Sequence, residues 1–172
     1  MNRPKLYLFV GYPGAGKTTV AKIIHELTGA THLWADKIRR ERLGPPNYTH
    51  KENTELYNHL NELTGELLRA GNSVIFDTNF KFYKDREHLR QIASEHGADT
   101  VVVWLTTPKE EARHRATEPH HQKDTRLHGH MSPEDFERLS SGLEAPRPEE
   151  QAIRIDGTDI NAEDIKQRLG LS

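Results

Sequence analysis

A glycine-rich segment at residues 11–18 constrains the fold of this chain more than any other part of its sequence. It reads Gly-Tyr-Pro-Gly-Ala-Gly-Lys-Thr and joins an apolar block at residues 6–10 to a helical pattern that begins at Thr18. In this strand–loop–helix order, glycines let backbone N–H groups point inward, and the helix N-terminus adds its positive dipole. The segment predicts a phosphate-binding loop; a glycine-rich turn with an incidental lysine is the alternative.

The residue types in this loop suit a nucleoside triphosphate. Lys17 would reach the outer phosphates as a point charge, and the Thr18 hydroxyl would be a ligand of Mg²⁺. Guanine specificity is not expected, because no Asn-Lys-x-Asp sequence is present. The residues expected to bind the nucleotide here are Gly11, Pro13, Gly14, Ala15, Gly16, Lys17, Thr18 and Thr19.

Short apolar blocks alternate with helix-period segments along the whole chain. The blocks lie at residues 6–10, 31–35, 74–76, 101–105 and 152–155, and the helical patterns at 18–28, 53–70, 82–96, 132–139 and 162–169, with a further helix beginning at Asp36. Most blocks are dense in aliphatic and aromatic residues, as in strands buried on both faces of a parallel sheet. We therefore expect an α/β doubly wound fold in a single domain spanning residues 1–172.

Two stretches interrupt this alternation. Residues 44–53 form a proline-containing loop, and residues 117–131 are polar and rich in His, Lys and Arg. A loop of that length without secondary structure is often functional, so we expect a polar lid over about residues 113–131. Histidines cluster in this insert, but no cysteine or matching spacing accompanies them, which favours an exposed lid over a metal site. The histidines are His120, His121, His128 and His130.

The composition excludes several classes of protein. Lys plus Arg total 24 and Asp plus Glu total 26, and this net charge of −2 argues against a general nucleic-acid-coating protein. The absence of cysteine excludes disulfides and thiol catalysis. No apolar run is long enough to span a membrane, and the N-terminal residues lead directly into a strand-like block. We expect a cytoplasmic protein with no membrane association and no obligate protein partner.

Two carboxylates follow predicted strands. Asp36 opens a helix, where it could accept a proton from an incoming hydroxyl or simply act as an N-cap. Arg39 lies one turn further along the same helix face and could hold an anionic group of an acceptor or be a surface cation. Asp77 ends the block at 74–76, a position that places a carboxylate near Mg²⁺, although a turn residue is the alternative there.

Arginines surround the polar insert. Arg113 and Arg115 precede it, and Lys123 and Arg126 lie within it. An arginine on a closing lid would neutralise charge that develops on a transferring phosphoryl group, whereas a solvated charge run needs no such role. We expect one or two of these cations to act, and we expect the adenine to lie near Arg113 and the turn at Gly157.

These features resemble the small P-loop kinases grouped with polynucleotide 5′-hydroxyl kinases and zeta-toxin-like kinases. The resemblance covers residues 6–148 and is carried by residues 11–19, Asp36 with Arg39, the segment 77–79, residues 104–108 with Arg113 and Arg115, and the helix at 131–143. It implies a P-loop NTPase fold with a parallel five-stranded sheet of order 2-3-1-4-5, flanked by helices, with ATP as donor and Mg²⁺ as cofactor.

The same resemblance implies roles for individual residues. Asp36 would be the base on the acceptor hydroxyl, Arg39 a ligand of an acceptor phosphate, and the lid arginine either Arg115 or Arg126. One departure is clear, because the polynucleotide kinases carry lid arginines four residues apart, whereas Arg115 is followed by Ala-Thr-Glu-Pro.

We therefore expect an ATP-dependent phosphotransferase that acts on an acceptor hydroxyl. The acceptor is undecided between a nucleic acid or nucleoside 5′-hydroxyl and a small molecule such as a sugar or antibiotic. Basic clusters at 37–42 and 81–90 would track a nucleic-acid backbone if they flank the cleft, or they are helix-surface charge balanced by neighbouring acids. The alternative from another class is a nucleotide-dependent switch with weak ATPase activity.

Overall fold

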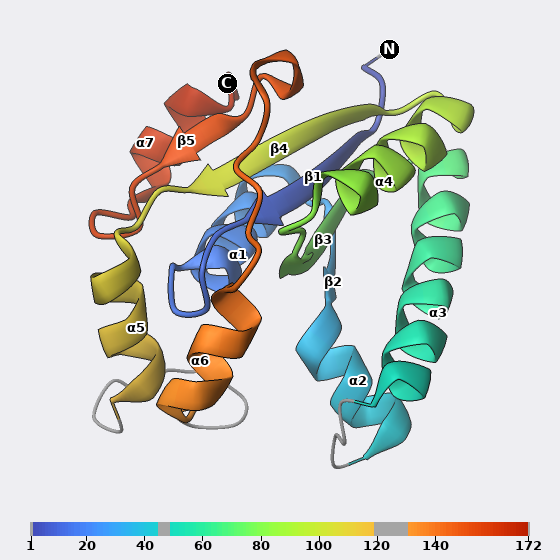
Figure 1. Cartoon of the computed structure of the whole chain (residues 1–172). Coiled ribbons are helices and arrows are strands. Elements are labelled where there is room, and N and C mark those ends of the chain that lie inside the picture. Colours follow the sequence, from blue (N-terminus) through green and yellow to red (C-terminus); the bar gives the residue numbers. More distant parts are fainter. Residues whose placement is uncertain (1, 45–48, 119–130, 172) are drawn as a thin grey trace.

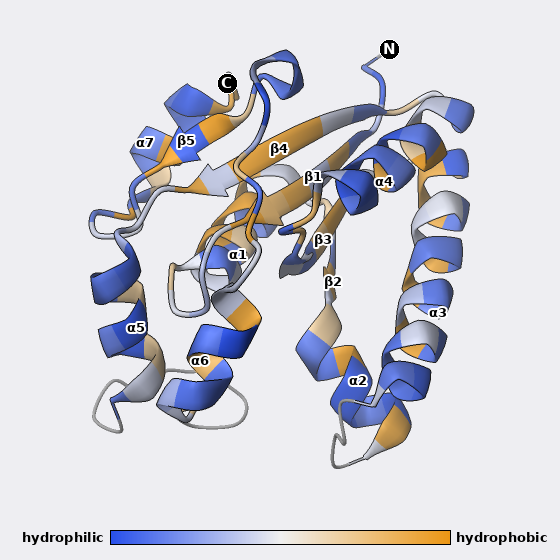
Figure 2. Ribbon diagram, viewed as in Figure 1, coloured by the Kyte–Doolittle hydropathy of each residue, from blue (hydrophilic) through white to orange (hydrophobic). Residues whose placement is uncertain are grey.

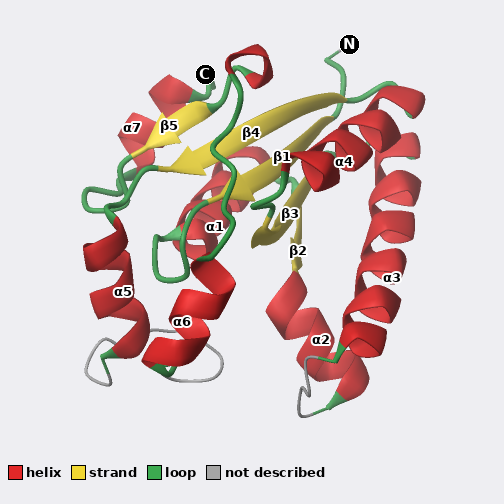
Figure 3. Ribbon diagram, in the orientation of Figure 1, coloured by secondary structure: helices red, strands yellow, loops and turns green. Residues whose placement is uncertain are grey.

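A parallel five-stranded sheet lies between two layers of helices (Figures 1 and 3). The computed structural model describes residues 2–44, 49–118 and 131–171. Its strands are β1 (Lys5–Val10), β2 (Thr31–Trp34), β3 (Val74–Asn79), β4 (Asp99–Leu105) and β5 (Ile153–Ile155). They pair in the order β2-β3-β1-β4-β5, with every pair parallel. The predicted fold class and strand order are confirmed.

The helices agree with the sequence pattern except at two places. They are α1 (Lys17–Thr28), α2 (Ala35–Leu43), α3 (His50–Arg69), α4 (Tyr83–Glu95), α5 (Lys109–Thr117), α6 (Pro133–Ser140) and α7 (Ala162–Arg168), with a 3₁₀ helix η2 at Pro148–Glu150. The predicted loop at 44–53 is too long, because Thr49 caps α3 by accepting a hydrogen bond from the Glu52 N–H. Helix α5 was not predicted, since its apolar face consists of alanines alone, Ala112 and Ala116.

Alternate side chains of β1 enter two separate cores. Tyr7 and Phe9 pack with α1 and α7, whereas Leu6 and Leu8 pack with α3 and α4. This alternation follows from the two-residue period of a strand. Both faces of the sheet are therefore covered, which is why the central strands β1, β3 and β4 contain continuous apolar runs (Figure 2).

The carboxyl ends of the strands meet at the edge from which two pairs of helices extend. Helices α2 and α3 extend on one side and α5 and α6 on the other (Figure 1). At this edge β3 departs from regular pairing, because Leu8 is opposite Phe76 but Phe9 is opposite Asn79. Such an irregularity re-aims side chains and is common beside active sites. Asp77 and Thr78 occupy the irregular position.

No helix in the described part of the chain combines the length and the apolar character that crossing a bilayer requires.

Candidate active site

The glycine-rich loop adopts a conformation that only its glycines permit. Gly14 and Gly16 have φ angles of 81° and 110°, in the left-handed region. A Cβ on Gly14 would overlap the carbonyl oxygen of Ala112, and one on Gly16 would lie 2.7 Å from Ile160. Helix α1 begins at Lys17, so the predicted strand–loop–helix arrangement is confirmed.

Residues from distant segments support this loop. The Thr107 hydroxyl donates a hydrogen bond to the Ala15 carbonyl at 2.8 Å, and the Gly11 N–H donates to Asn79 Oδ1 at 3.4 Å. A Cβ on Gly157 would overlap both Thr107 Oγ1 and the Ala15 carbonyl oxygen. Thr107 and Asn79 had no assigned role in the sequence. Their positions could have indicated a role, because Asn79 ends β3 and Thr107 follows β4, the two strands that pair with β1. Ligands of such sheets bind at the carboxyl ends of these strands.

Lys17 is the charged centre of the loop. Its Nζ donates to the carbonyl oxygens of Gly11 at 3.0 Å and Tyr12 at 2.8 Å. Burial lowers the pKa of Lys17 to about 8, while the charges of Asp77 and Asp36 act in the opposite direction. The fold thus brings both carboxylates predicted from the sequence within electrostatic reach of Lys17.

Asp36 is not the N-cap of its helix, and Asp77 is not a turn residue, so neither structural alternative to a site role holds. The N-cap of α2 is Trp34, which makes no side-chain cap, and Asp36 lies in the first turn with an exposed side chain. Asp77 lies inside β3 and not in a turn, with a side chain that is only 4% exposed. Asp36 is therefore accessible to a ligand, whereas Asp77 is held in place by the sheet.

Asp77 has a partner that sequence reasoning missed. Its Oδ2 lies 2.8 Å from Nε2 of His32 on β2. The His32 ring stacks on Trp34 with an interplanar angle of 3°. Trp34 is partly exposed, and Lys22 Nζ lies 5.1 Å from the centroid of its ring. Trp104 is likewise partly exposed beneath the Arg154 guanidinium.

Thr18 and Asp77 provide oxygen donors suited to Mg²⁺. Both residues line the same cleft as Lys17. No group of three or more His, Asp or Glu residues in the described ranges could form a dedicated metal cage. Mg²⁺ usually takes one or two protein ligands and completes its shell with substrate phosphates and water. The donor set fits that kind of ion, and the assignment of Thr18 and Asp77 stays a prediction.

Arg39 joins α2 to the first turn of α3. Its Nη1 lies 2.6 Å from Oε1 of Glu52, and the two side chains are 5% and 7% exposed. Nearby, the Tyr57 hydroxyl lies 2.7 Å from Thr78 Oγ1. Burial raises the pKa of Tyr57, with smaller effects from Thr78, Asp36 and Arg39. These groups form a polar wall beside Asp36.

A cleft of about 1390 Å³ connects the loop with this wall. It is bounded by α2 and α3 on one side and by α5 and α6 on the other. The predicted site residues that line it are Pro13, Gly14, Gly16, Lys17, Thr18, Thr19, Asp36, Arg39, Asp77, Arg115 and Gly157. Gly11 and Ala15 are buried behind the loop. Most of the predicted site therefore converges on one cavity.

The arginines around the insert differ in position. Arg115 lines the cleft, where its Nη1 donates to the Gly157 carbonyl at 2.8 Å and its Nε to Glu111 at 3.2 Å. Arg113 is not among the described residues that line the cleft. Arg126 and the four clustered histidines lie outside the described residues. Of the two candidates for a lid arginine, Arg115 lies beside the predicted nucleotide site, and its role there stays a prediction.

The second basic cluster is divided: Lys81 and Lys84 line the cleft, whereas Arg86 and Arg90 do not. Arg86 is fully buried, and its Nε donates to Glu150 at 2.8 Å. Arg90 donates to the same carboxylate at 2.9 Å. In the first cluster, Lys37 lies 4.0 Å from Glu41. The interpretation as helix-surface charge balanced by neighbouring acids holds for Lys37 and for Arg90, which also pairs with Glu87. It is wrong for Arg86, because that side chain is buried and its partner Glu150 is distant in sequence.

Comparisons with known proteins agree with this geometry. A family model described as "AAA domain" matches residues 6–146. The fold is similar to the Mycobacterium tuberculosis APS kinase CysC in complex with AMPPNP and APS (TM-score 0.71, 18% identity, 99% of this chain and 98% of that chain). It is also similar to a gluconokinase from Sinorhizobium meliloti 1021 (TM-score 0.64, 22% identity, 97% and 89%).

A further similar structure is a chain of the Pnkp1/Rnl/Hen1 RNA repair complex, with a TM-score of 0.68 and 21% identity over 83% of this chain and 45% of that chain. No curated relative matches this sequence. At these identities the structural likenesses establish the fold alone.

Proposed function

The chain belongs to the AAA domain family, and from this premise we propose that it is an ATP-dependent phosphotransferase acting on an acceptor hydroxyl. The observation that carries the proposal is the convergence of Lys17, Asp36 and Asp77 on one cleft. Phosphoryl transfer needs a loop that binds phosphates, a carboxylate beside it and a carboxylate that an acceptor can reach. Lys17, Asp77 and Asp36 correspond to these three parts. The kinases among the similar structures support the same reaction class.

ATP would bind with its phosphates against the loop. Lys17 would exchange the carbonyl oxygens of Gly11 and Tyr12 for the outer phosphates, and the backbone N–H groups at the start of α1 would donate to them. Thr18 and Asp77 would hold Mg²⁺, which when bound neutralises charge on the phosphate oxygens. His32 would fix the orientation of the Asp77 carboxylate through its hydrogen bond.

Asp36 would act on the acceptor. Its carboxylate takes the proton of the acceptor hydroxyl as the hydroxyl oxygen forms a bond to the γ-phosphorus, and the bond from that phosphorus to the bridging oxygen breaks to release ADP. Arg115 would stabilise charge on the transferring group, because it already lies on the cleft beside Gly157. Arg126 stays a predicted second lid cation.

The test uses ATP labelled at the γ-phosphate and a panel of hydroxyl acceptors. Lys17→Ala should abolish transfer, because the loop loses its phosphate cation. Asp36→Asn should retain ATP binding and lower the transfer rate by about 10²–10⁴-fold, the usual contribution of a general base. The matched control is Asp159→Asn, an exposed carboxylate outside the cleft, which should leave the rate unchanged.

One result would contradict the proposal. If label appears only as inorganic phosphate, at equal rates in the unmodified protein and in Asp36→Asn, then Asp36 serves no acceptor. The nucleotide-dependent switch would be the better description of the protein in that case.

A further inference from the structure

Helix α3 presents an uncharged polar face to the cleft. Its cleft-lining residues are His50, Asn53, Thr54, Tyr57, Asn58 and Asn61. Their spacings of three and four place them along one side of the helix for about three turns. The charged residues of the same turns, Lys51, Glu52 and Glu55, do not line the cleft. The surface of this chain is heavily charged elsewhere, so this face is a local exception.

The chemistry of this face suits hydroxyl groups. Asparagine amides donate two hydrogen bonds and accept others, and threonine and tyrosine hydroxyls do both. The buried amide oxygen of Asn53 accepts no hydrogen bond within the described part of the chain. That oxygen therefore keeps an unused capacity to accept a hydrogen bond. Asp36 lines the same cleft, and its charge acts on Tyr57 in the middle of this face.

Several cations of the cleft outside the nucleotide loop are already engaged. Arg39 pairs with Glu52, and Arg138 donates to Asp135 at 3.1 Å. Lys81 Nζ donates to the backbone carbonyls of Leu139 and Ser141 at 3.1 and 2.9 Å.

Lys84 differs from these cations, because it is exposed and has no partner among the residues that the structure describes. One such lysine is not a track for a phosphate backbone, which requires several cations in sequence. The cleft also carries the carboxylate of Asp85, which would repel an anionic acceptor.

We infer that the acceptor is a small neutral polyhydroxylated molecule, of the sugar, polyol or nucleoside class, held by the uncharged face of α3. Several of its hydroxyls bind the asparagine, threonine and tyrosine side chains while one hydroxyl lies against Asp36. The transfer step of this inference rests on the proposed function. The choice of ligand class rests on the face of α3 and on the engaged cations.

The first arm of the test measures transfer from labelled ATP. The acceptors are glucose, ribose, myo-inositol and adenosine, compared with a 5′-hydroxyl oligodeoxynucleotide. Asn58→Ala and Asn61→Ala should each raise the KM for the neutral acceptor about five- to tenfold, as expected for one lost hydrogen bond, and leave kcat within about twofold. Glu55→Ala is the matched control on the same helix and should change neither constant. Phosphorylation of the oligonucleotide alone would overturn the inference.

The second arm measures binding without turnover, in the presence of Mg²⁺ and a non-hydrolysable ATP analogue. Saturation-transfer NMR should detect at least one of the neutral acceptors, and its signal should weaken in Asn58→Ala and Asn61→Ala but not in Glu55→Ala. The inference would be overturned if the oligonucleotide bound tightly in fluorescence anisotropy while no neutral acceptor gave an NMR signal. It would also be overturned if the NMR signal of the acceptor were equal in all variants. If no acceptor receives phosphate at all, the proposed function fails, and this binding arm alone decides the ligand class.

Discussion

Lys17 links the electrostatics of the loop to the nucleotide. In the free chain its ammonium group is bound by two backbone carbonyls, and burial lowers its pKa to about 8 despite the opposing charges of Asp77 and Asp36. Phosphate oxygens placed beside it would favour the charged form and raise the pKa again. Above pH 8 the lysine is then mostly neutral in the free protein and charged in the complex.

ATP binding should therefore take up protons at alkaline pH. At pH 8.5 a group with a pKa of about 8 is roughly three-quarters deprotonated, so we expect uptake of up to about 0.7 proton per ATP. Calorimetric titrations in buffers with different ionisation enthalpies measure this quantity. Lys17→Arg keeps its charge at this pH and should show no such uptake. Equal uptake in both proteins would assign the proton to another group.

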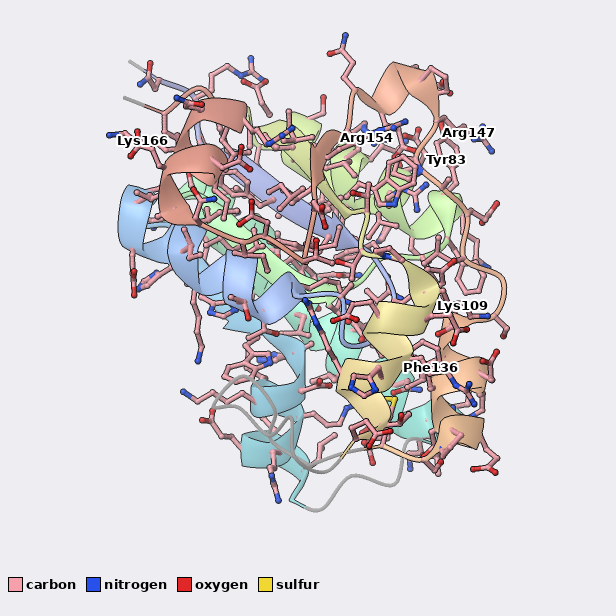
Figure 4. The ribbon with its side chains drawn as sticks, turned by 90° about the vertical axis from the view of Figure 1, so that its left-hand side faces the viewer. Tyr83, Lys109, Phe136, Arg147, Arg154 and Lys166 are labelled. Carbon is pink, nitrogen blue, oxygen red and sulfur yellow. The ribbon has the colours of Figure 1, made fainter. Side chains whose placement is uncertain are left out.

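The elements around the glycine loop pack closely against it and against one another. The turn at Gly157 and the residue Thr107, which follows β4, both contact Ala15 of the loop. Arg115 of α5 donates to the Gly157 carbonyl, which joins the lid side of the cleft to the same turn. Phe136 of α6 packs near Tyr12 of the loop, and Figure 4 shows it on the helix beside Lys109 of α5. The loop geometry thus depends on several elements at once.

Gly157→Ala should weaken ATP binding by about tenfold or more. The added methyl group would overlap Thr107 Oγ1 and the Ala15 carbonyl, so either the turn or the loop must move. A fluorescent ATP analogue measures the dissociation constant. Asp159→Ala, an exposed residue two positions further along, is the control and should bind ATP as tightly as the unmodified chain. Unchanged affinity for ATP in Gly157→Ala would show that the turn at residue 157 can shift to accommodate the methyl group while the glycine loop keeps its conformation.

At the scale of the whole molecule, a buried ion cluster fastens the segment after α6 to α4. Glu150 of η2 accepts hydrogen bonds from Arg86 and Arg90, and the Arg86 Nη1 also donates to the Phe80 carbonyl at 2.7 Å. Arg147 lies over the Tyr83 ring, 3.4 Å from its centroid (Figure 4). This cluster ties the chain that leads into β5 to helix α4, which packs on β4 and β1.

Glu150→Gln should lower the free energy of unfolding by about 3 kcal/mol at pH 7, because it leaves the buried Arg86 without a counter-charge. Burial would raise the pKa of Glu150, but hydrogen bonds from Arg86, the Arg147 backbone and Arg90 outweigh it and hold the pKa at about 2. The unfolded chain has the higher pKa, so this stabilisation is complete above about pH 4.5 and is lost as the pH falls towards 2.

Urea unfolding at pH 7 and pH 3 measures the effect. The difference between Glu150→Gln and the unmodified chain should narrow at pH 3. Glu149→Gln, the exposed neighbour, is the control and should match the unmodified chain at both values. If the difference in the free energy of unfolding were the same at both pH values, the loss of stability would come from packing and not from the charge of Glu150.

Local patterns in the sequence determined the elements and the loop. The glycine loop and the alternation of apolar blocks with helices both depend on residues a few positions apart, and the structure confirms the strand–loop–helix order and the alternation. The resemblance that these residues carry also predicted the strand order. Helix α5 was missed because two alanines give too weak a period to distinguish a helix.

Only the tertiary structure decided which residues meet across the cleft. The partners of Asp77 and Arg39, namely His32 and Glu52, come from separate elements, and no local spacing connects them. The uncharged face of α3 was equally hidden, since its period is visible in the sequence but the cavity it borders is not. Hydrogen bonds and ion pairs act over a few ångströms, so their partners are set by how the helices pack on the sheet and not by the order of residues along the chain.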